Sequence, residues 1–566
     1  MIGQSEIEIK ANVTHLRTKD ALRSQATGAS GVVLLCRAIL AVIFSAAICL
    51  NPSVSRGQDH APGSARELWL YYPTNLLVDQ NIDRLKEIWT RAAKSGYTHV
   101  LLADSKFGRL AEMEGTAYFT NVERTKKIAA DLRLKLVPAL FSIGYSNDLL
   151  GRDPNLAEGL PVIDSPFVVK DGVATLAADP VTLSKPAFVD PAVRIEGDTA
   201  TVSPHDGNAR LCYKIKLTPH RCYHVSVRIK TDDHTGQPEI KALAGERSLQ
   251  WQNLDVKRTQ DWTEHHVVFN SLDNASASLY FGVWGDAKGS LRWRDWRIEE
   301  VGLLNVLRRP GTPVVVKGDD GKLYREGLDY APIADPRMGN QPYAGEYEVY
   351  HAPPTIKTKL PDGTRLKVSW YHPAIIYDGQ VSACIAEPKL DELLADQARR
   401  MKAAWGASAA GWMMSHDEFR TLGWCNACAA SHQSPGQLLS ANIERCARLL
   451  APDPTYVWND MFDPTHNAVP GPYYLVNGPW TDSWRGLPSS VVIMNWNHAK
   501  RAESLRFFTA RGHKQIVATY YDDPALTQTR EWIDTAGADP SVVGFMYTTW
   551  NHDYAQMEAF ATLVRK

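Results

Sequence analysis

The sequence has no excess of charge of either sign. Its 62 lysines and arginines almost balance its 63 aspartates and glutamates, which leaves a formal net charge of -1. Proteins that bind nucleic acid or anionic membranes usually carry a basic surface, so this balance indicates neither partner. With 566 residues, 44% of them hydrophobic, the chain is long enough for two or three domains. We therefore expect a neutral partner and no nucleic acid.

Long apolar segments are also scarce. The one conspicuous run extends from Ala38 to Leu50, directly after Arg37, and it is short for a membrane span. A positive residue followed by such a run is typical of a secretory signal. We expect residues 1–58 to be a signal peptide or an N-terminal anchor, and the remainder to be exported (periplasmic or extracellular). Any membrane contact is expected only through that anchor.

Cysteine is rare, with eight residues in the chain. Cys425 and Cys428 form the one Cys-x-x-Cys motif, and Cys384 and Cys446 are candidates to complete a zinc site with it. Structural zinc sites often combine two such motifs, and a second is missing here. In an exported chain the same cysteines are compatible with disulfides. A disulfide or buried thiols is the favoured interpretation, and no metal or cofactor is predicted.

From residue 67 onward, short apolar strands alternate with amphipathic helical segments, a pattern typical of a parallel sheet. Between about 166 and 335 the pattern changes to many short strands with alternating polarity, flanked by Asp-Gly hairpins, as in an antiparallel sandwich. We predict an α/β fold: a (β/α)8 TIM barrel with a jelly-roll β-sandwich inserted after its third strand. The predicted barrel parts are 65–165 and 336–566, and the inserted part is 166–335. The predicted barrel strands are ELWLYY, THVLLAD and KLVPALFS before the insertion, and AGWMM, TYVWND, SVVIMNWN, KQIVATYYDD and SVVGFMYTTWN after it.

Acidic and aromatic residues recur where the later barrel strands end. In such a barrel these ends form the active site. Flat aromatic rings cover the apolar faces of a sugar while carboxylates bind its hydroxyls, so the pattern favours an oligo- or polysaccharide partner. The candidate residues are Asp417 and Glu418 for catalysis, and His416, Trp458, Asp460, Trp496, Tyr520, Tyr521, Asp523 and Trp550 for substrate binding.

Asp417 and Glu418 are adjacent, which is unusual for a glycosidase pair. Neighbours on an extended chain point to opposite faces, whereas glycosidases hold two carboxyl groups across the bond at about 5 to 9.5 Å. Either a second carboxylate such as Asp460 comes from another strand, or the substrate supplies its own nucleophile. In the second case one acid protonates the leaving oxygen and its neighbour steers a substrate group.

The order of these motifs resembles glycoside hydrolase family 20, the β-N-acetylhexosaminidases. The resemblance implies retaining hydrolysis assisted by the substrate's 2-acetamido group. By position it makes Glu418 the general acid, lets Asp417 orient the acetamido group, and has Tyr521 or Tyr520 hold its carbonyl oxygen. It also implies that the tryptophans wall the sugar pocket. The predicted insert resembles a carbohydrate-binding module, in which Trp251, Trp284, Trp293 and Trp296 either stack on a glycan or fill the core.

Other interpretations stay open. Glu418 could pair with Arg420 in an ordinary loop after a buried strand. The chain could bind glycans without cleaving them, or cleave them with a second carboxylate as nucleophile. A metal-assisted hydrolase using His416, Asp417 and the nearby thiols is a further alternative. The sequence nevertheless favours a secreted glycoside hydrolase.

Overall fold

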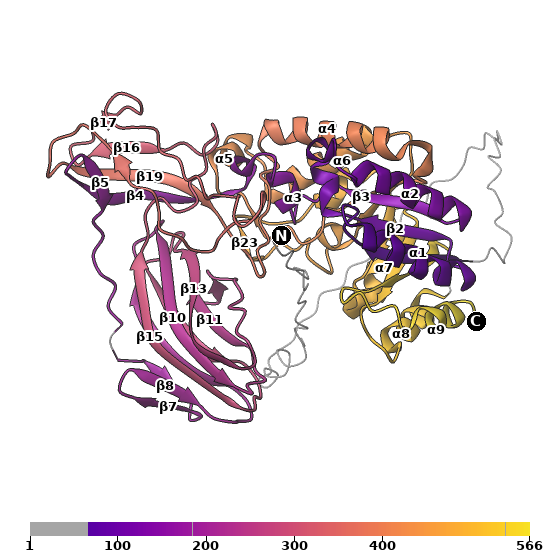
Figure 1. Cartoon of the computed structure of the whole chain (residues 1–566), viewed down its shortest axis with the longest axis horizontal. Coiled ribbons are helices and arrows are strands. Elements are labelled where there is room, and N and C mark those ends of the chain that lie inside the picture. Colours follow the sequence, from indigo (N-terminus) through magenta and orange to yellow (C-terminus); the bar gives the residue numbers. More distant parts are fainter. Residues whose placement is uncertain (1–65, 184, 538) are drawn as a thin grey trace, which may run out of the picture.

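The computed structural model describes residues 66–183, 185–537 and 539–566, and the predicted leader at 1–58 lies outside them. Figure 1 shows a helix-covered barrel on one side of the molecule and layered antiparallel strands on the other. Within these ranges no helix combines the length and apolarity that crossing a membrane requires.

A ring of eight parallel strands in the described chain forms a closed barrel. β1 pairs with both β2 and β26, which closes the ring. The prediction of a parallel barrel built from these eight segments is confirmed. In ring order the strands are β1 (Glu67–Pro73), β2 (His99–Ala103), β3 (Lys135–Leu140), β20 (Trp412–Met414), β22 (Thr455–Trp458), β24 (Val492–Asn495), β25 (Gln515–Tyr520) and β26 (Val542–Thr548).

Side chains alternate between the inside and outside of the barrel, as the pleat of a strand requires. Trp69, Met413, Met494 and Met546 are fully buried inside it. The leucines on either side of Trp69 point outward and pack beneath the helices. The barrel is therefore a filled core, and a substrate can reach it only at the strand ends.

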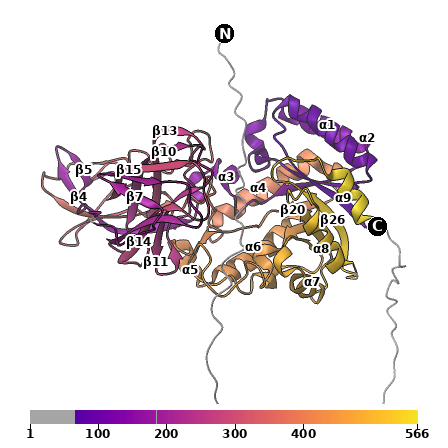
Figure 2. The ribbon, with the colours of Figure 1, turned by 90° about the horizontal axis from the view of Figure 1, so that it is seen from below.

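Amphipathic helices cover the outside. One of them, α4 (Pro388–Trp405), has proline in its first turn and Gly406 at its C-cap in a positive-φ conformation (φ 46°) that favours glycine. Figure 2 shows α1 and α2 on the opposite side of the barrel from α7 and α8. The helices are α1 (Asp79–Lys94), α2 (Tyr118–Asp131), α3 (Asn147–Leu150), α4 (Pro388–Trp405), α5 (Asn426–Ser431), α6 (Pro435–Leu450), α7 (Arg501–Thr509), α8 (Thr527–Ala536) and α9 (Met557–Val564).

Between β3 and β20 the chain builds two antiparallel five-stranded sheets that share one hydrophobic core. This is the sandwich that the alternating polarity predicts. One sheet has the order β13 (Gln260–Asn270), β10 (Cys222–Asp232), β15 (Ser290–Glu300), β8 (Thr199–Val202) and β7 (Val193–Glu196). The other has the order β12 (Arg247–Ser248), β11 (Pro238–Ala244), β14 (Ser276–Val283), β9 (Ala209–Lys216) and β6 (Phe188–Val189).

The two hairpins predicted to flank the sandwich join into one further sheet with its own apolar cluster. Its central strands are β4 and β19, which pair over most of their length. The predicted boundaries at 166 and 335 therefore cut through this sheet, because hairpin patterns do not reveal which distant strand lies between them. Its order is β17 (Leu323–Tyr324), β16 (Val315–Gly318), β19 (Arg365–Pro373), β4 (Gly159–Lys170), β5 (Val173–Leu176) and β18 (Ile356–Lys357).

The tryptophans of the sandwich occupy different environments. Trp293 is 1% exposed and fills the core, so it does not present a face to a glycan. Trp296 packs on the same core, and Lys241 covers Trp284 with its ammonium 4.0 Å from the ring centre. Trp251 also packs against this core, and its ring lies tilted against that of Tyr474, with the ring centres 4.3 Å apart.

The six cysteines of the described ranges are all buried and carry free thiols. Buried thiols were one of the two favoured interpretations, and the disulfide alternative does not occur among these residues. Cys446 lies on α6 with its Sγ 3.6 Å from Asn442 Oδ1, apart from the other thiols. The four-cysteine zinc set suggested by the sequence is therefore not assembled.

Candidate active site

The loop that follows β20 carries the two adjacent acids at the C-terminal mouth of the barrel. The loop after β3 presses against it, because a Cβ on Gly144 would collide with the carbonyl oxygen of Asp417. Glycine at this position allows the two backbones to approach so closely.

Asp417 and Glu418 do not follow the alternation expected of an extended chain. Glu418 has a positive φ of 47°, and its backbone N–H donates to Asp460 Oδ2 at 2.8 Å. This turn brings both carboxyl groups close to the same neighbouring residue, Tyr521. Tyr521 lies close enough to both acids for their charges to add to burial in raising its pKa.

The carboxylate of Glu418 is held at both oxygens. Arg420 places a guanidinium nitrogen 2.6 Å from Oε1, and the hydroxyl of Tyr145 donates to Oε2 at 2.5 Å. Arg420 is buried, with Tyr377 and Tyr474 facing its guanidinium at 4.9 and 5.0 Å. The Glu418–Arg420 pair considered from the sequence therefore forms, but inside an aromatic enclosure and not on an open surface.

Asp417 is in a different environment from its neighbour. In the described part of the chain, no other residue donates a hydrogen bond to its carboxyl group. Burial, and then the charge of Glu418, raise its pKa from 3.8 to about 7. Asp417 is half-buried, so it is accessible to a bound molecule. The two adjacent carboxyl groups thus have different surroundings: burial favours the protonated form of Asp417, while Glu418 is held by an ion pair with Arg420 and a hydrogen bond from Tyr145.

Asp460 accepts a hydrogen bond from the backbone of this pair. It is fully buried and accepts hydrogen bonds at Oδ2 from the Glu418 backbone and from Asn467 Nδ2, the second at 3.0 Å. Burial first, and then the charge of Asp417, raise its pKa well above the usual range. Its position fits the orientation of Glu418 better than contact with a substrate.

Aromatic rings from five other strands surround the acids. Tyr71, in the C-terminal half of β1, lies 5.1 Å from the ring of Trp550 and 6.3 Å from that of Trp458. Tyr521 follows β25 and is 6.2 Å from Trp550 and 6.1 Å from Trp496. These ring distances place the five side chains in one continuous wall at the barrel mouth. The wall includes all three tryptophans predicted from the strand ends.

Three predicted binding residues are placed elsewhere. His416 is fully buried beside α6, with Nε2 3.0 Å from Asn442 Oδ1, because the strand's alternation turns it away from the mouth. Tyr520 is also fully buried and stacks on Tyr547 at 4.1 Å. Asp523 accepts backbone hydrogen bonds from Ala525 at 3.1 Å and Gln528 at 3.0 Å, which orders the loop before α8. None of the three faces Asp417.

Sequence reasoning missed several members of the site. Tyr71 could have been found, because it lies near the C-terminal end of β1, as the other candidates do in or after their strands. Tyr145, Tyr377 and Tyr474 lie on connections outside the barrel strands, where no periodic pattern marks them. Arg420 was noticed only as a surface partner, since a sequence does not indicate that aromatic rings will enclose it.

No family model and no curated protein matches the sequence. Among solved structures, a pneumococcal exo-β-D-N-acetylglucosaminidase with tandem GH20 catalytic modules is similar over 88% of this chain and 83% of its own, at 10% identity and a TM-score of 0.34. A GH20 exo-β-N-acetylglucosaminidase from Vibrio harveyi aligns with 65% of this chain and 94% of its own, at 8% identity and a TM-score of 0.26. A CBM4 structure aligns with 21% of this chain and 77% of its own, at 15% identity and a TM-score of 0.16. At these scores none of the similarities carries an argument about function.

Proposed function

We propose that this chain is a glycoside hydrolase whose acid–base group is the Asp417–Glu418 pair. The observation that carries the proposal is the unequal setting of two adjacent carboxyl groups inside an aromatic wall. Pairs of acids whose environments separate their pKa values are the usual means of supplying one proton donor and one carboxylate at neutral pH. The rings of Tyr71, Trp496 and Trp550 suit the apolar face of a sugar.

We assign the proton to Asp417. Its pKa of about 7 keeps about half of it protonated at neutral pH, and its carboxyl has no competing hydrogen bond from another described residue. A leaving glycosidic oxygen can therefore accept that proton. The family 20 resemblance assigns this role to Glu418 instead. Arg420 and Tyr145, however, already contact both oxygens of Glu418.

The roles of the two acids also favour one class of substrate. With Asp417 as donor, Glu418 is the carboxylate that steers the group attacking the anomeric carbon. In a 2-acetamido sugar that group is the substrate's own carbonyl oxygen, and adjacent carboxyl groups suit this arrangement. In any other sugar, a carboxylate of the chain would have to attack the anomeric carbon or activate a water that does, and Glu418 is the carboxylate nearest to Asp417 for that role. We propose the 2-acetamido sugar, because the Arg420 and Tyr145 contacts hold Glu418 back from such an approach.

The test uses aryl glycosides with leaving groups of graded acidity, made on sugars with and without the 2-acetamido group. Asp417→Asn should lose activity with poor leaving groups and keep much of it with 2,4-dinitrophenolate, which needs no proton. Glu418→Gln should lose activity with both. Glu444→Gln, on the exposed face of α6 beside Arg448, is the matched control.

The activities of the two variants distinguish which of Asp417 and Glu418 donates the proton. If Glu418→Gln is the variant rescued by the good leaving group, the roles are those of the family 20 resemblance. Activity on sugars without the acetamido group would contradict substrate assistance. Binding of glycans without hydrolysis of any member would contradict the enzyme and favour a glycan-binding protein. For the wild type, kcat/KM should fall as pH rises through about 7, since the proton donor is then lost.

A further inference from the structure

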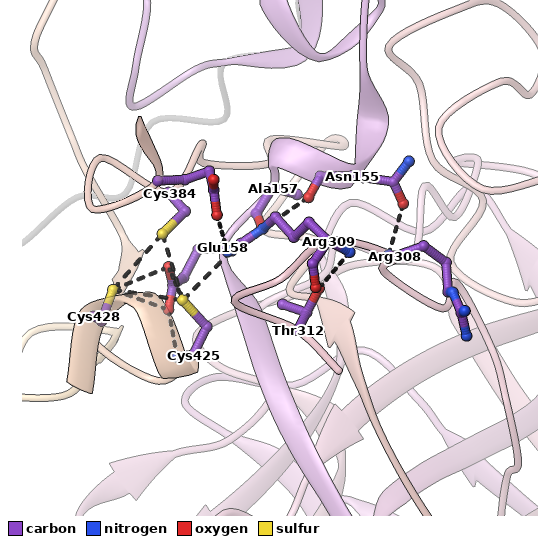
Figure 3. Close-up of polar contacts among 10 residues, drawn as sticks. Asn155, Ala157, Glu158, Arg308, Arg309, Thr312, Cys384, Cys425 and Cys428 are labelled. Atoms are coloured by element: carbon purple, nitrogen blue, oxygen red, sulfur yellow. Dashed lines mark hydrogen bonds and ion pairs between the residues drawn. The ribbon is translucent and has the colours of Figure 1, made fainter. Parts of the chain in front are cut away.

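Three thiols and one carboxylate meet in the interior, away from the aromatic wall. Glu158 directly precedes β4, Cys384 precedes α4, and Cys425 and Cys428 lie at the start of α5. All four are buried, with exposed fractions of 1%, 0%, 0% and 4% in that order. Figure 3 shows the sulfur atoms and the carboxylate pointing toward one another. In the described ranges, this is the one group of ligand-type side chains close enough to share a metal ion.

The distances match the edges of a tetrahedron around one ion. The sulfur of Cys384 is 3.5 Å from that of Cys425 and 3.7 Å from that of Cys428, and the latter two are 3.7 Å apart. Tetrahedral zinc with Zn–S bonds of about 2.3 Å requires sulfur–sulfur edges of about 3.8 Å. The spacing therefore leaves room for a single ion equidistant from all three.

The carboxylate fits the fourth corner. Glu158 Oε2 is 3.6 Å from the sulfur of Cys425 and 3.4 Å from that of Cys428. A Zn–O bond of about 2.0 Å predicts sulfur–oxygen edges of about 3.5 Å. The other oxygen, Oε1, accepts backbone hydrogen bonds from Trp424 at 2.8 Å and Cys425 at 3.1 Å. The carboxylate is thus oriented by the backbone, with one oxygen directed at the thiols.

A buried cation adjoins the cluster. Arg309, whose side chain is 4% exposed, directs Nη2 to the sulfur of Cys425 at 3.4 Å and Nη1 to Glu387 Oε2 at 3.0 Å. Three thiolates and a carboxylate around a divalent ion would leave a net negative charge in the interior. The guanidinium offsets part of that charge, and such partners typically tune a metal site.

We propose that Glu158, Cys384, Cys425 and Cys428 bind one thiophilic divalent ion, of which Zn²⁺ is the best fit, at a structural site. Four protein ligands leave no open position, which is the arrangement of structural rather than catalytic zinc. The ion would join the base of the hairpin sheet, the segment before α4 and the loop after β20. A disulfide is the competing chemistry, and it would bring two sulfurs to about 2.05 Å while leaving the third unpaired. The near-equal spacing of the three sulfurs favours the ion.

The first measurement uses the full chain, purified without chelators and analysed by elemental mass spectrometry. We expect one equivalent of zinc per chain. Metal-free, reduced protein is then titrated with Co²⁺, which in a tetrahedral thiolate site gives intense visible bands and a thiolate-to-metal charge-transfer band. One equivalent of Co²⁺ should saturate these bands, and Zn²⁺ should abolish them. This readout depends on no variant and on no enzymatic activity.

Variants then assign the ligands. Cys384→Ser and Cys428→Ser should lose the charge-transfer intensity of one sulfur and bind Co²⁺ at least about tenfold more weakly, and Arg309→Met should also weaken binding by about 10- to 100-fold. Cys446→Ser, equally buried but outside the cluster, should bind like the wild type. The proposal is overturned if the reduced protein takes up no Zn²⁺ or Co²⁺. It is also overturned if the purified chain contains a disulfide between two of the three cysteines, or if Cys446→Ser is the variant that loses metal.

Discussion

Replacing Asp417 by asparagine should make the protein more stable at alkaline pH while damaging its activity. In the folded chain, burial and the neighbouring Glu418 raise the pKa of Asp417 from 3.8 to about 7. A raised pKa of an acid means that the folded state binds its proton more tightly than the unfolded state does. The resulting stability is fully present below the unfolded pKa and is lost as pH rises through about 7. Asparagine, which has no charge to bury, avoids that loss.

The size of the stability difference follows from the pKa change of Asp417. A rise of that pKa from 3.8 to about 7, at about 1.4 kcal/mol for each tenfold change in proton affinity, gives an upper bound of about 4 kcal/mol. Because Asp417 is half-buried, solvent screens part of the effect, and we expect about 2 kcal/mol. The variant should therefore unfold at a higher urea concentration than the wild type at about pH 9. Near pH 4 the two curves should lie close together, since the folded wild-type side chain is then neutral and the unfolded one, with its pKa of 3.8, is only about half ionised.

Urea unfolding followed by tryptophan fluorescence at several pH values measures the difference. Asp131→Asn, at the exposed end of α2 beside Lys127, is the matched control and should change stability by less than about 0.5 kcal/mol. The reasoning about Asp417 is refuted if its asparagine variant is no more stable than the wild type at alkaline pH. It is equally refuted if the gain is the same at pH 4 and pH 9.

Three further predictions concern single side chains. Tyr521→Phe should lower kcat/KM with little change in stability, because no described residue hydrogen-bonds its hydroxyl. Tyr520→Phe should leave activity intact and cost about 1 kcal/mol, because its buried hydroxyl donates to Asp553. Glycosidase assays and urea unfolding compare the two variants. Gly144→Ala should reduce activity, because the added Cβ would displace the loop after β20. Gly471→Ala, where an added Cβ meets open space, should not. Identical kinetics for the two variants would contradict the close approach of Gly144 to the Asp417 carbonyl. Trp293→Ala should destabilise the sandwich by about 3 to 5 kcal/mol and leave hydrolysis of small aryl glycosides unchanged, as measured by calorimetry and the same assay.

The barrel was predictable because its strands are read from local patterns. An apolar run that ends in polar and aromatic residues marks both a strand and its end, and parallel closure brings those ends together. Trp496 and Trp550 were found in this way without knowledge of any contact. The hairpin sheet was not predicted, since its central pair joins β4 with β19, and no local pattern records a partner about 200 residues distant.

The site was only partly predictable, for reasons of backbone conformation. Tyr520 and Tyr521 are equivalent in sequence, but β25 ends between them and both have positive φ values, of 82° and 46°. Which ring reaches the acids depends on that local turn, which the residue types do not specify. The same holds for Glu418, whose positive φ cancels the alternation expected of an extended chain. Glu158 is a single acid far from any cysteine motif, so only the folded chain reveals it beside the thiols.

The short segment from Glu418 to Cys428 links the two proposed sites. At one end the Arg420 side chain contacts Glu418. The backbone carbonyl of Arg420 accepts a hydrogen bond from the N–H of Leu475 at 3.0 Å, next to the pair of strands β21 (Thr421–Leu422) and β23 (Leu475–Val476). At the other end the backbone N–H of Cys425 donates a hydrogen bond to Glu158 Oε1 at 3.1 Å. An ion among the thiols would fix this far end and, through β21, the position of the guanidinium. Metal removal should therefore lower kcat/KM, whereas loss of the Asp417 carboxyl should leave metal content unchanged, so each proposal can fail without the other.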